Sequence, residues 1–248
     1  MLELTAQQKN PLFAIQCLLK GFQWLMRKEL RKYFLLPLLV NILLYSGLFA
    51  LGYFYLTDLI NSLIPDWLSW LEWLLWPLFL ISFLVTGFFT FTLVANLIAS
   101  PFYNHLAART EELLSGDKVD IEEQPMLKVL LAETKRIGYL LSRMLPLLLL
   151  FVIPLVNLIA PLLWALFGAW GCALEYMAYP LENKGLLFRE QRQLLQQSRL
   201  SVLTFGGVVV LGITVPIVNL LMAPAAVIAA TVFFYSANNV DNKKQASK

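Results

Sequence analysis

Hydrophobic residues are gathered into four long uncharged runs, and polar and charged residues fill the stretches between them. The first run, 33–57, has about 25 residues; as a helix rising about 1.5 Å per residue it would cross a bilayer core of about 30 Å. The second run begins at residue 73, and its helix continues past the last uncharged position into a polar extension. We therefore predict one transmembrane span over 33–57 and a second, longer one over 73–114.

The third and fourth runs, 144–174 and 201–240, each carry prolines and an asparagine near the middle. These residues are Pro154, Asn157 and Pro161 in the third run and Pro216, Asn219 and Pro224 in the fourth. Proline and asparagine are unfavourable inside a helix, and the third run is shorter than the roughly 37 residues that two crossings and a turn require. We therefore predict a Pro-broken helical hairpin over 144–174 and another over 201–240.

The two interruptions, 153–161 and 215–224, look like copies of each other. Paired, Pro-interrupted apolar segments are typical of discontinuous helices around a transport site. The same pattern also fits two tight helical turns that simply end the apolar runs. Both interpretations remain open on the sequence alone.

Charge indicates which connections share a side of the membrane. The connection 58–72 has three acidic residues and no Lys or Arg, whereas the stretch before residue 33 is rich in bases. The positive-inside rule then places the N-terminus in the cytoplasm and 58–72 in the periplasm. The connection 180–199 carries four basic residues, and it lies on the cytoplasmic side only if each hairpin enters and leaves by the same face.

Three polar stretches are predicted to form amphipathic helices that flank the apolar runs. Asn10 as cap and Pro11 at the first position open one helix over 11–31, whose apolar residues recur at helical spacing. Similar patterns predict helices over 126–143 and 186–200. Such helices lie in the plane of the membrane interface. The whole chain, 1–248, is thus interpreted as a single all-α integral membrane domain.

The composition agrees with a membrane protein and excludes several other classes. The chain is 59% hydrophobic and 14% charged, far from the balance of an ordinary soluble domain. It has no nucleotide-binding glycine loop, serine elbow or Cys/His cluster, and no basic glycine-rich surface for nucleic acid. We therefore expect no enzyme activity, no catalytic residues, no metal or other cofactor and no nucleic-acid partner.

A basic cluster, Arg27-Lys28-Glu29-Leu30-Arg31-Lys32, stands where the first amphipathic helix must turn into the first span. The start of a helix offers unpaired N–H groups and a partial positive charge, which together with Arg31 and Lys32 would suit a tetrahedral oxyanion. Bases beside a membrane span are also common anchors for lipid headgroups. Spacing alone does not separate an anion site from a lipid anchor.

Few other polar residues are candidates for a transport path. Asn41, Asn157 and Asn219 lie within the apolar runs, where asparagine normally faces protein or water. Glu111 lies close to the membrane surface, where it either pairs with Arg109 or water or tunes the entry of an anion. We treat these four as candidate pathway or hairpin residues.

Several separated motifs make the chain resemble the CysZ family of bacterial sulfate transporters. They are Leu30-Arg31-Lys32-Tyr33 with 36–41, Ser100-Pro101-Phe102-Tyr103 with Glu111 and 114–116, Tyr179-Pro180 with Gly185 and Phe188, Phe205-Gly206, 216–224 and 229–231. The resemblance implies a permease of the bacterial inner (plasma) membrane that takes up sulfate for cysteine biosynthesis. It also implies two full transmembrane helices and two hemi-penetrating hairpins, and we expect a multi-pass homo-oligomer in the lipid bilayer.

The resemblance also implies where sulfate binds. A Gly-Leu-Arg-Arg stretch before the first span binds sulfate in the family, and it corresponds here to Glu29, Leu30, Arg31 and Lys32. Glu29 replaces the glycine, and its carboxylate would oppose an anion unless it points away or pairs with a neighbouring base. The alternative function is a non-transporting membrane scaffold or regulatory protein whose basic cluster binds lipid headgroups.

Overall fold

A computed structural model describes residues 4–63, 72–119, 121–122 and 124–245, and in these ranges the chain is helical with no strand. The all-α prediction is confirmed for this part of the chain. Residues 1–31 and 103–248 form one compact unit, and residues 32–102 form a second. The helices are α1 (Pro11–Leu25), α2 (Lys28–Leu63), α3 (Glu72–Ser115), α4 (Met126–Leu150), α5 (Ala160–Tyr176), α6 (Ala178–Glu182), α7 (Phe188–Gln196), α8 (Arg199–Thr214) and α9 (Pro216–Gln245).

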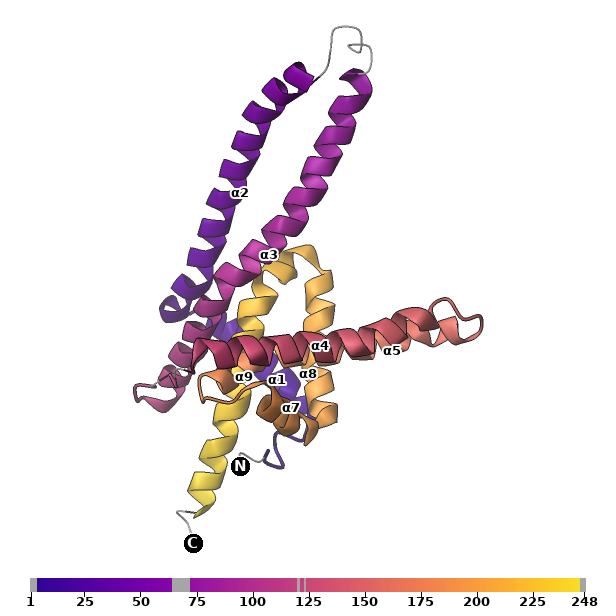
Figure 1. The fold of residues 1–248 in the computed structure, drawn as a ribbon. Coiled ribbons are helices and arrows are strands. Elements are labelled where there is room, and N and C mark those ends of the chain that lie inside the picture. Colours follow the sequence, from indigo (N-terminus) through magenta and orange to yellow (C-terminus); the bar gives the residue numbers. More distant parts are fainter. Residues whose placement is uncertain (1–3, 64–71, 120, 123, 246–248) are drawn as a thin grey trace. The chain divides into compact units, whose positions relative to one another are not determined.

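The unit of residues 32–102 consists of the greater parts of two very long helices. Helix α2 has 36 residues and α3 has 44, and their portions in this unit run side by side (Figure 1). The predicted segments 33–57 and 73–114 lie within these helices. Among the described residues, length and apolar composition mark only Lys28–Leu51 as a helix able to cross a membrane. Counting the sharply bent pair α7 and α8 as one broken span would raise that number to two.

In the other unit, α1 begins as its sequence predicts. The Asn10 side chain accepts a hydrogen bond from the Leu12 amide at 3.0 Å, and Pro11 occupies the first helical position. However, the prediction of one helix over 11–31 is wrong, because α1 ends at Leu25 and α2 begins at Lys28. The apolar face of α1 is buried against α9 and α8. The basic cluster is therefore placed at the start of α2 and not on the surface of α1.

Small residues allow the helices of this unit to approach closely. A Cβ atom added to Gly21 of α1 would collide with the carbonyl oxygen of Ala225 in α9. A Cβ atom added to Gly206 of α8 would likewise collide with the carbonyl oxygen of Ala169 in α5. Close backbone approach through small residues is the usual way in which helices pack within a membrane. These contacts join α1, α5, α8 and α9 into the core of the unit.

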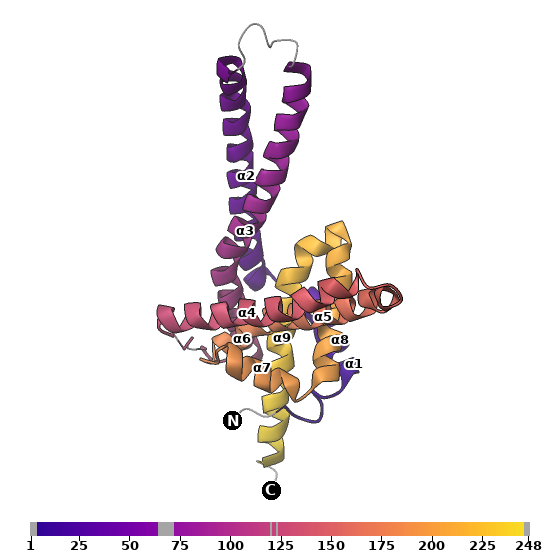
Figure 2. The ribbon, with the colours of Figure 1, turned by 45° about the vertical axis from the view of Figure 1, so that its right-hand side comes forward.

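The predicted hairpin segment 144–174 falls in α4 and α5, which lie alongside each other (Figure 2). The predicted boundary between an amphipathic helix over 126–143 and the hairpin is wrong, because α4 continues through it to Leu150. The break falls at residues 151–159, where a short 3₁₀ turn includes Asn157 and Leu155 has a φ of 69°. Apolar side chains at this tip are highly exposed, with Leu155 at 81%. Such exposed apolar surface is typical of contact with lipid or a partner.

The second predicted hairpin segment, 201–240, falls in α8 and α9. Its interruption is a single extended residue, Val215, and the predicted break from Pro216 to Pro224 is wrong because α9 begins at Pro216 and runs through Pro224. Proline fits the first position of a helix, where its missing N–H has no acceptor to reach, so Pro216 starts α9. The hydrogen bond lost at Pro224 is offset by the packing of the following turns, which are fully buried. The two interruptions are therefore not structural copies.

The predicted amphipathic helix 186–200 is also divided. Helix α7 covers Phe188–Gln196, and α8 begins at Arg199 after a bend of 108°. The bend separates a polar helix from an apolar one. It therefore marks the place where this part of the chain changes from an amphipathic to an apolar surface.

Candidate anion-binding site

The turn between α1 and α2 leaves two backbone amides free at the start of α2. The Arg27 amide donates to the carbonyl of Trp24 at 2.9 Å, and the amides of Leu30 and Arg31 both donate to the carbonyl of Arg27 at 3.1 Å. Within the described part of the chain, the amides of Lys28 and Glu29 donate no hydrogen bond. Unpaired amides at a helix start attract anions, because the helix dipole adds a partial positive charge there.

Two arginine side chains lie close to this turn. The Arg27 guanidinium stacks over the Trp24 ring, 3.8 Å from its centre. The Nε of Arg31 donates to the carbonyl of Met26 at 2.8 Å, which brings this side chain back over the turn. Both residues are exposed and neither forms an ion pair among the described residues, so their remaining N–H groups are available to an acceptor.

Leu30 and Glu29, which the resemblance assigns to the same site, differ in their surroundings. Leu30 is completely buried, and its amide donates a hydrogen bond to the carbonyl of Arg27. Glu29 is exposed in the first turn of α2 and forms no ion pair within the described residues. An acid in this position stabilises the helix start through the dipole, so it competes with a bound anion for the same positive potential.

Lys32 belongs to the unit of residues 32–102, as does Asn41. The Lys32 ammonium lies 5.0 Å from the centre of the Tyr33 ring, and its side chain is exposed. Asn41 lies within α2, and its side chain is outside the described residues.

The other predicted polar residues occupy three separate places. Glu111 forms an ion pair with Lys184, with 3.0 Å between Oε1 and Nζ. Asn157 is exposed at the tip between α4 and α5, and Asn219 is exposed in the first turn of α9. No hydrogen bond among the described residues joins any two of these three side chains.

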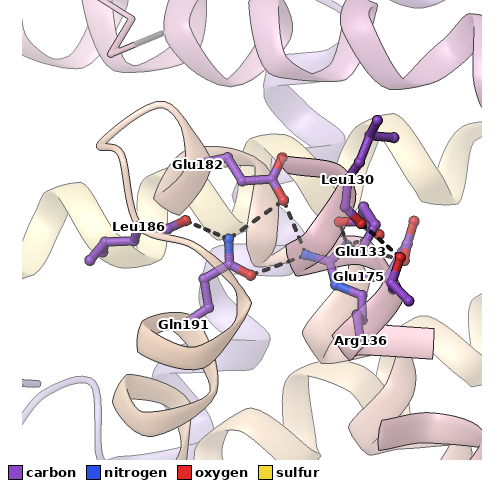
Figure 3. A network of polar contacts seen from close by, with 8 residues as sticks. Leu130, Glu133, Arg136, Glu175, Glu182, Leu186 and Gln191 are labelled. Carbon is purple, nitrogen blue, oxygen red and sulfur yellow. Dashed lines mark hydrogen bonds and ion pairs between the residues drawn. The ribbon is translucent and has the colours of Figure 1, made fainter. Parts of the chain in front are cut away.

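A polar network that the sequence pattern does not reveal surrounds Arg136 of α4 (Figure 3). The guanidinium contacts the carboxylates of Glu133 at 3.1 Å, Glu182 at 3.1 Å and Glu175 at 3.9 Å. It also donates to Oε1 of Gln191 at 3.1 Å, while the amide of that glutamine donates to the Leu186 carbonyl. Only the Glu133–Arg136 spacing is visible as a helical pair in the sequence. The remaining partners come from α5, α6 and α7.

The Arg136 network joins the base of the α4–α5 hairpin to α6 and α7. The Arg136 side chain is only 9% exposed, so the carboxylates compensate a charge that has lost most of its water. Burial raises the pKa of Glu133, although the positive charge of Arg136 acts in the opposite direction. A cavity of about 160 Å³ lies beside the network and is bordered by Glu122, Glu133 and Glu182 together with neutral polar and apolar residues.

Together, these features define an α-helical membrane protein with a positively charged helix start. Many apolar residues of this helix are exposed, and at its start, among the described residues, two amides donate no hydrogen bond and two arginines form no ion pair. The comparisons with known proteins agree with this class. Residues 17–224 match the family described as sulfate transporter CysZ/Etoposide-induced protein 2.4.

Relatives of similar length are found in several bacteria. The chain is 40% identical to a sulfate transporter CysZ of Pseudomonas syringae pv. tomato over 239 residues, covering 91% of this chain and 93% of the relative. It is 40% identical to the protein of that name from Pseudomonas aeruginosa PAO1, covering 88% and 93%, and 36% identical to that of Vibrio atlanticus, covering 85% and 87%. The chain belongs to the CysZ family and is a membrane protein.

Proposed function

We propose that this protein is a sulfate transporter or permease of the bacterial inner membrane that supplies sulfate for cysteine biosynthesis. The observation that carries the proposal is the match to relatives named sulfate transporter CysZ over about nine-tenths of the chain. The exposed arginines and free amides at the start of α2 support it, because they provide the donors that a sulfate dianion requires.

The proposed arrangement in the membrane has two long transmembrane helices, α2 and α3. The hairpins α4–α5 and α8–α9 enter the bilayer partway and return to the same side. This arrangement is supported by the charge pattern, since it keeps the N-terminus and the basic connection 180–199 both in the cytoplasm. We further propose that the protein works as a homo-oligomer.

In the proposed sulfate site, Arg31 and Lys32 supply positive charge and the amides of Lys28 and Glu29 supply hydrogen bonds. The role we assign to Leu30 is to fix the start of α2, because its side chain is completely buried. Glu29 weakens binding by its negative charge, so Glu29→Gln should increase the affinity for sulfate.

Uptake of radiolabelled sulfate into proteoliposomes tests the proposed function. Wild-type protein should give uptake above that of empty vesicles, and Arg31→Gln and Lys32→Gln should each weaken the apparent affinity by roughly tenfold. Lys20→Gln is the matched control, since Lys20 is also an exposed base but lies within α1, seven positions before Arg27. It should leave uptake unchanged.

Two results would contradict these proposals separately. Uptake no greater than that of empty vesicles would refute transport. Normal uptake with an unchanged sulfate affinity in Arg31→Gln and Lys32→Gln would leave transport intact but place the binding site elsewhere.

A further inference from the structure

Two arginines and a tyrosine meet between α4 and α7, apart from the start of α2. The guanidinium carbon of Arg143 lies 3.6 Å from the centre of the Tyr139 ring, and that of Arg192 lies 5.0 Å from the same point. Arg192 also lies 6.0 Å from the centre of the Phe188 ring. The two guanidinium carbons therefore lie no farther apart than these two distances to the Tyr139 ring centre added together.

Neither of these arginines has a carboxylate partner within the described residues. The nearby acids Glu133, Glu175 and Glu182 are all paired with Arg136. Arg143 donates only to groups of its own helix, the Tyr139 carbonyl at 3.2 Å and the Ser142 hydroxyl at 3.4 Å.

Arg192 is the more unusual of the two. It is half-buried, yet among the described residues it donates no hydrogen bond, and its Nε is buried without an acceptor. Stacking on an aromatic ring satisfies the charge of an arginine in part but gives its N–H groups no acceptor. A buried polar group without a partner in a native protein commonly marks a missing water, ion or ligand.

Tyr139 adds a third donor to this pair. Its hydroxyl oxygen accepts a hydrogen bond from Nε1 of Trp170 at 3.1 Å. Because the indole can only donate, the proton of the tyrosine hydroxyl is directed elsewhere. Among the described residues, the Arg192 guanidinium and the Tyr139 hydroxyl proton therefore have no acceptor, and Arg143 bonds only to its own helix, through one of its terminal nitrogens.

We propose that Arg143, Arg192 and Tyr139 form a second binding site, for a tetrahedral oxyanion such as a phosphate or sulfate group. Arginine forks match the oxygen geometry of such groups, and nearby aromatic rings keep the forks in place. Arg143 is the last charged residue before the uncharged stretch 144–174. This position is suited to the phosphate of an anionic lipid headgroup, and a free oxyanion from solution offers the same chemistry.

Calorimetry on the purified full-length protein in neutral detergent tests the site. The protein carries Arg31→Gln and Lys32→Gln, so that the site proposed at the start of α2 does not contribute. The probes are sodium sulfate, inorganic phosphate and a short-chain phosphatidylglycerol. Arg143→Gln and Arg192→Gln should each weaken binding by roughly tenfold, and Arg192→Lys should weaken it less.

Arg189→Gln is the matched control, because Arg189 is an exposed arginine of α7 without a ring contact among the described residues. It should leave binding unchanged. Binding of phosphatidylglycerol alone would identify a lipid headgroup site, and binding of sulfate or phosphate would identify a site for soluble oxyanions. The proposal is overturned if no probe binds, if Arg143→Gln has no effect, or if Arg189→Gln weakens binding as much as Arg143→Gln. Since Arg143 is exposed, its variant tests the site even if Arg192→Gln fails to fold.

Discussion

The contact between α5 and α8 makes two neighbouring glycines a direct test of the packing. A Cβ atom at position 206 would lie 2.7 Å from the carbonyl carbon of Ala169 and 3.0 Å from the amide nitrogen of Ala173. Both atoms belong to the backbone, so no side-chain rotation relieves the overlap. A Cβ atom at position 207 would instead lie 3.9 Å from the Cβ of Ala169, which is an ordinary contact. Gly206→Ala must therefore separate the two helices, and Gly207→Ala need not.

The magnitude follows from two opposing effects. Replacing glycine by alanine within a helix stabilises it by about 1 kcal/mol, and this gain applies to both positions. Overpacking of a close contact destabilises by about 1–3 kcal/mol, and this loss applies only to position 206. The difference in the free energy of unfolding between the two variants therefore isolates the packing effect, at about 1–3 kcal/mol in favour of Gly207→Ala.

Unfolding by sodium dodecyl sulfate in mixed micelles, followed by tryptophan fluorescence, measures this difference. Wild-type protein provides the reference for each variant. If the two variants are equally stable within about 0.5 kcal/mol, the close approach of α5 and α8 is refuted.

Three further predictions concern charge and backbone conformation. Arg136→Met should destabilise the protein by about 1.5–3 kcal/mol in the same assay. This is less than the loss for a fully buried ion pair, because the abandoned carboxylates are partly exposed and can regain water. The neighbouring exposed residue Lys135 supplies the control, since Lys135→Met should change stability by less than about 0.5 kcal/mol. Burial raises the pKa of Glu133 above 4.5, so the folded protein holds this proton more tightly than the unfolded chain. The contribution of Glu133 to stability should therefore be greatest below pH 4.5 and fall as the pH rises through the raised value, and Glu133→Gln should remove this fall. Gly185 has a φ of 73°, so Gly185→Ala should destabilise by about 1–2 kcal/mol, whereas Gly138→Ala, within α4 and with open space around it, should stabilise.

Each of these three predictions would be contradicted by a specific result. Equal effects of Arg136→Met and Lys135→Met would mean that the network contributes nothing to stability. A pH profile that Glu133→Gln leaves unchanged would assign the acid dependence to other groups. A Gly185→Ala variant as stable as wild type would contradict the left-handed conformation at that turn.

Local signals in the sequence were sufficient for the features that depend on a few neighbouring residues. Asn10 and Pro11 predict the start of α1 because capping involves only the first turn of a helix. The long apolar runs predict helices, since a backbone in lipid must satisfy its hydrogen bonds internally. The position of Arg31 near the turn also follows from local order in the chain.

Features that depend on distant partners could not be predicted in this way. Read alone, Pro224 predicts a break in the fourth run, but buried neighbours in α9 keep that helix continuous. In the sequence, Arg136 is one more base of an amphipathic helix, and only folding brings Glu182 and Gln191 to it from 46 and 55 positions away. The hydrogen bond from the Leu30 amide to the Arg27 carbonyl depends on where α1 ends. The apolar spacing of 11–31 does not reveal that end.

The docking of α1 on α9 has a consequence for the order of biosynthesis. A hydrogen bond from Gln8 to the carbonyl of Phe233 spans 225 positions, and Gly21 packs against a part of α9 that is made almost as late. Helix α1 therefore lacks most of its docking surface until α9 has been made, although α8 is available shortly before. During most of translation its apolar face needs another cover, and the membrane surface beside the translocon is the nearest that an amphipathic helix can use.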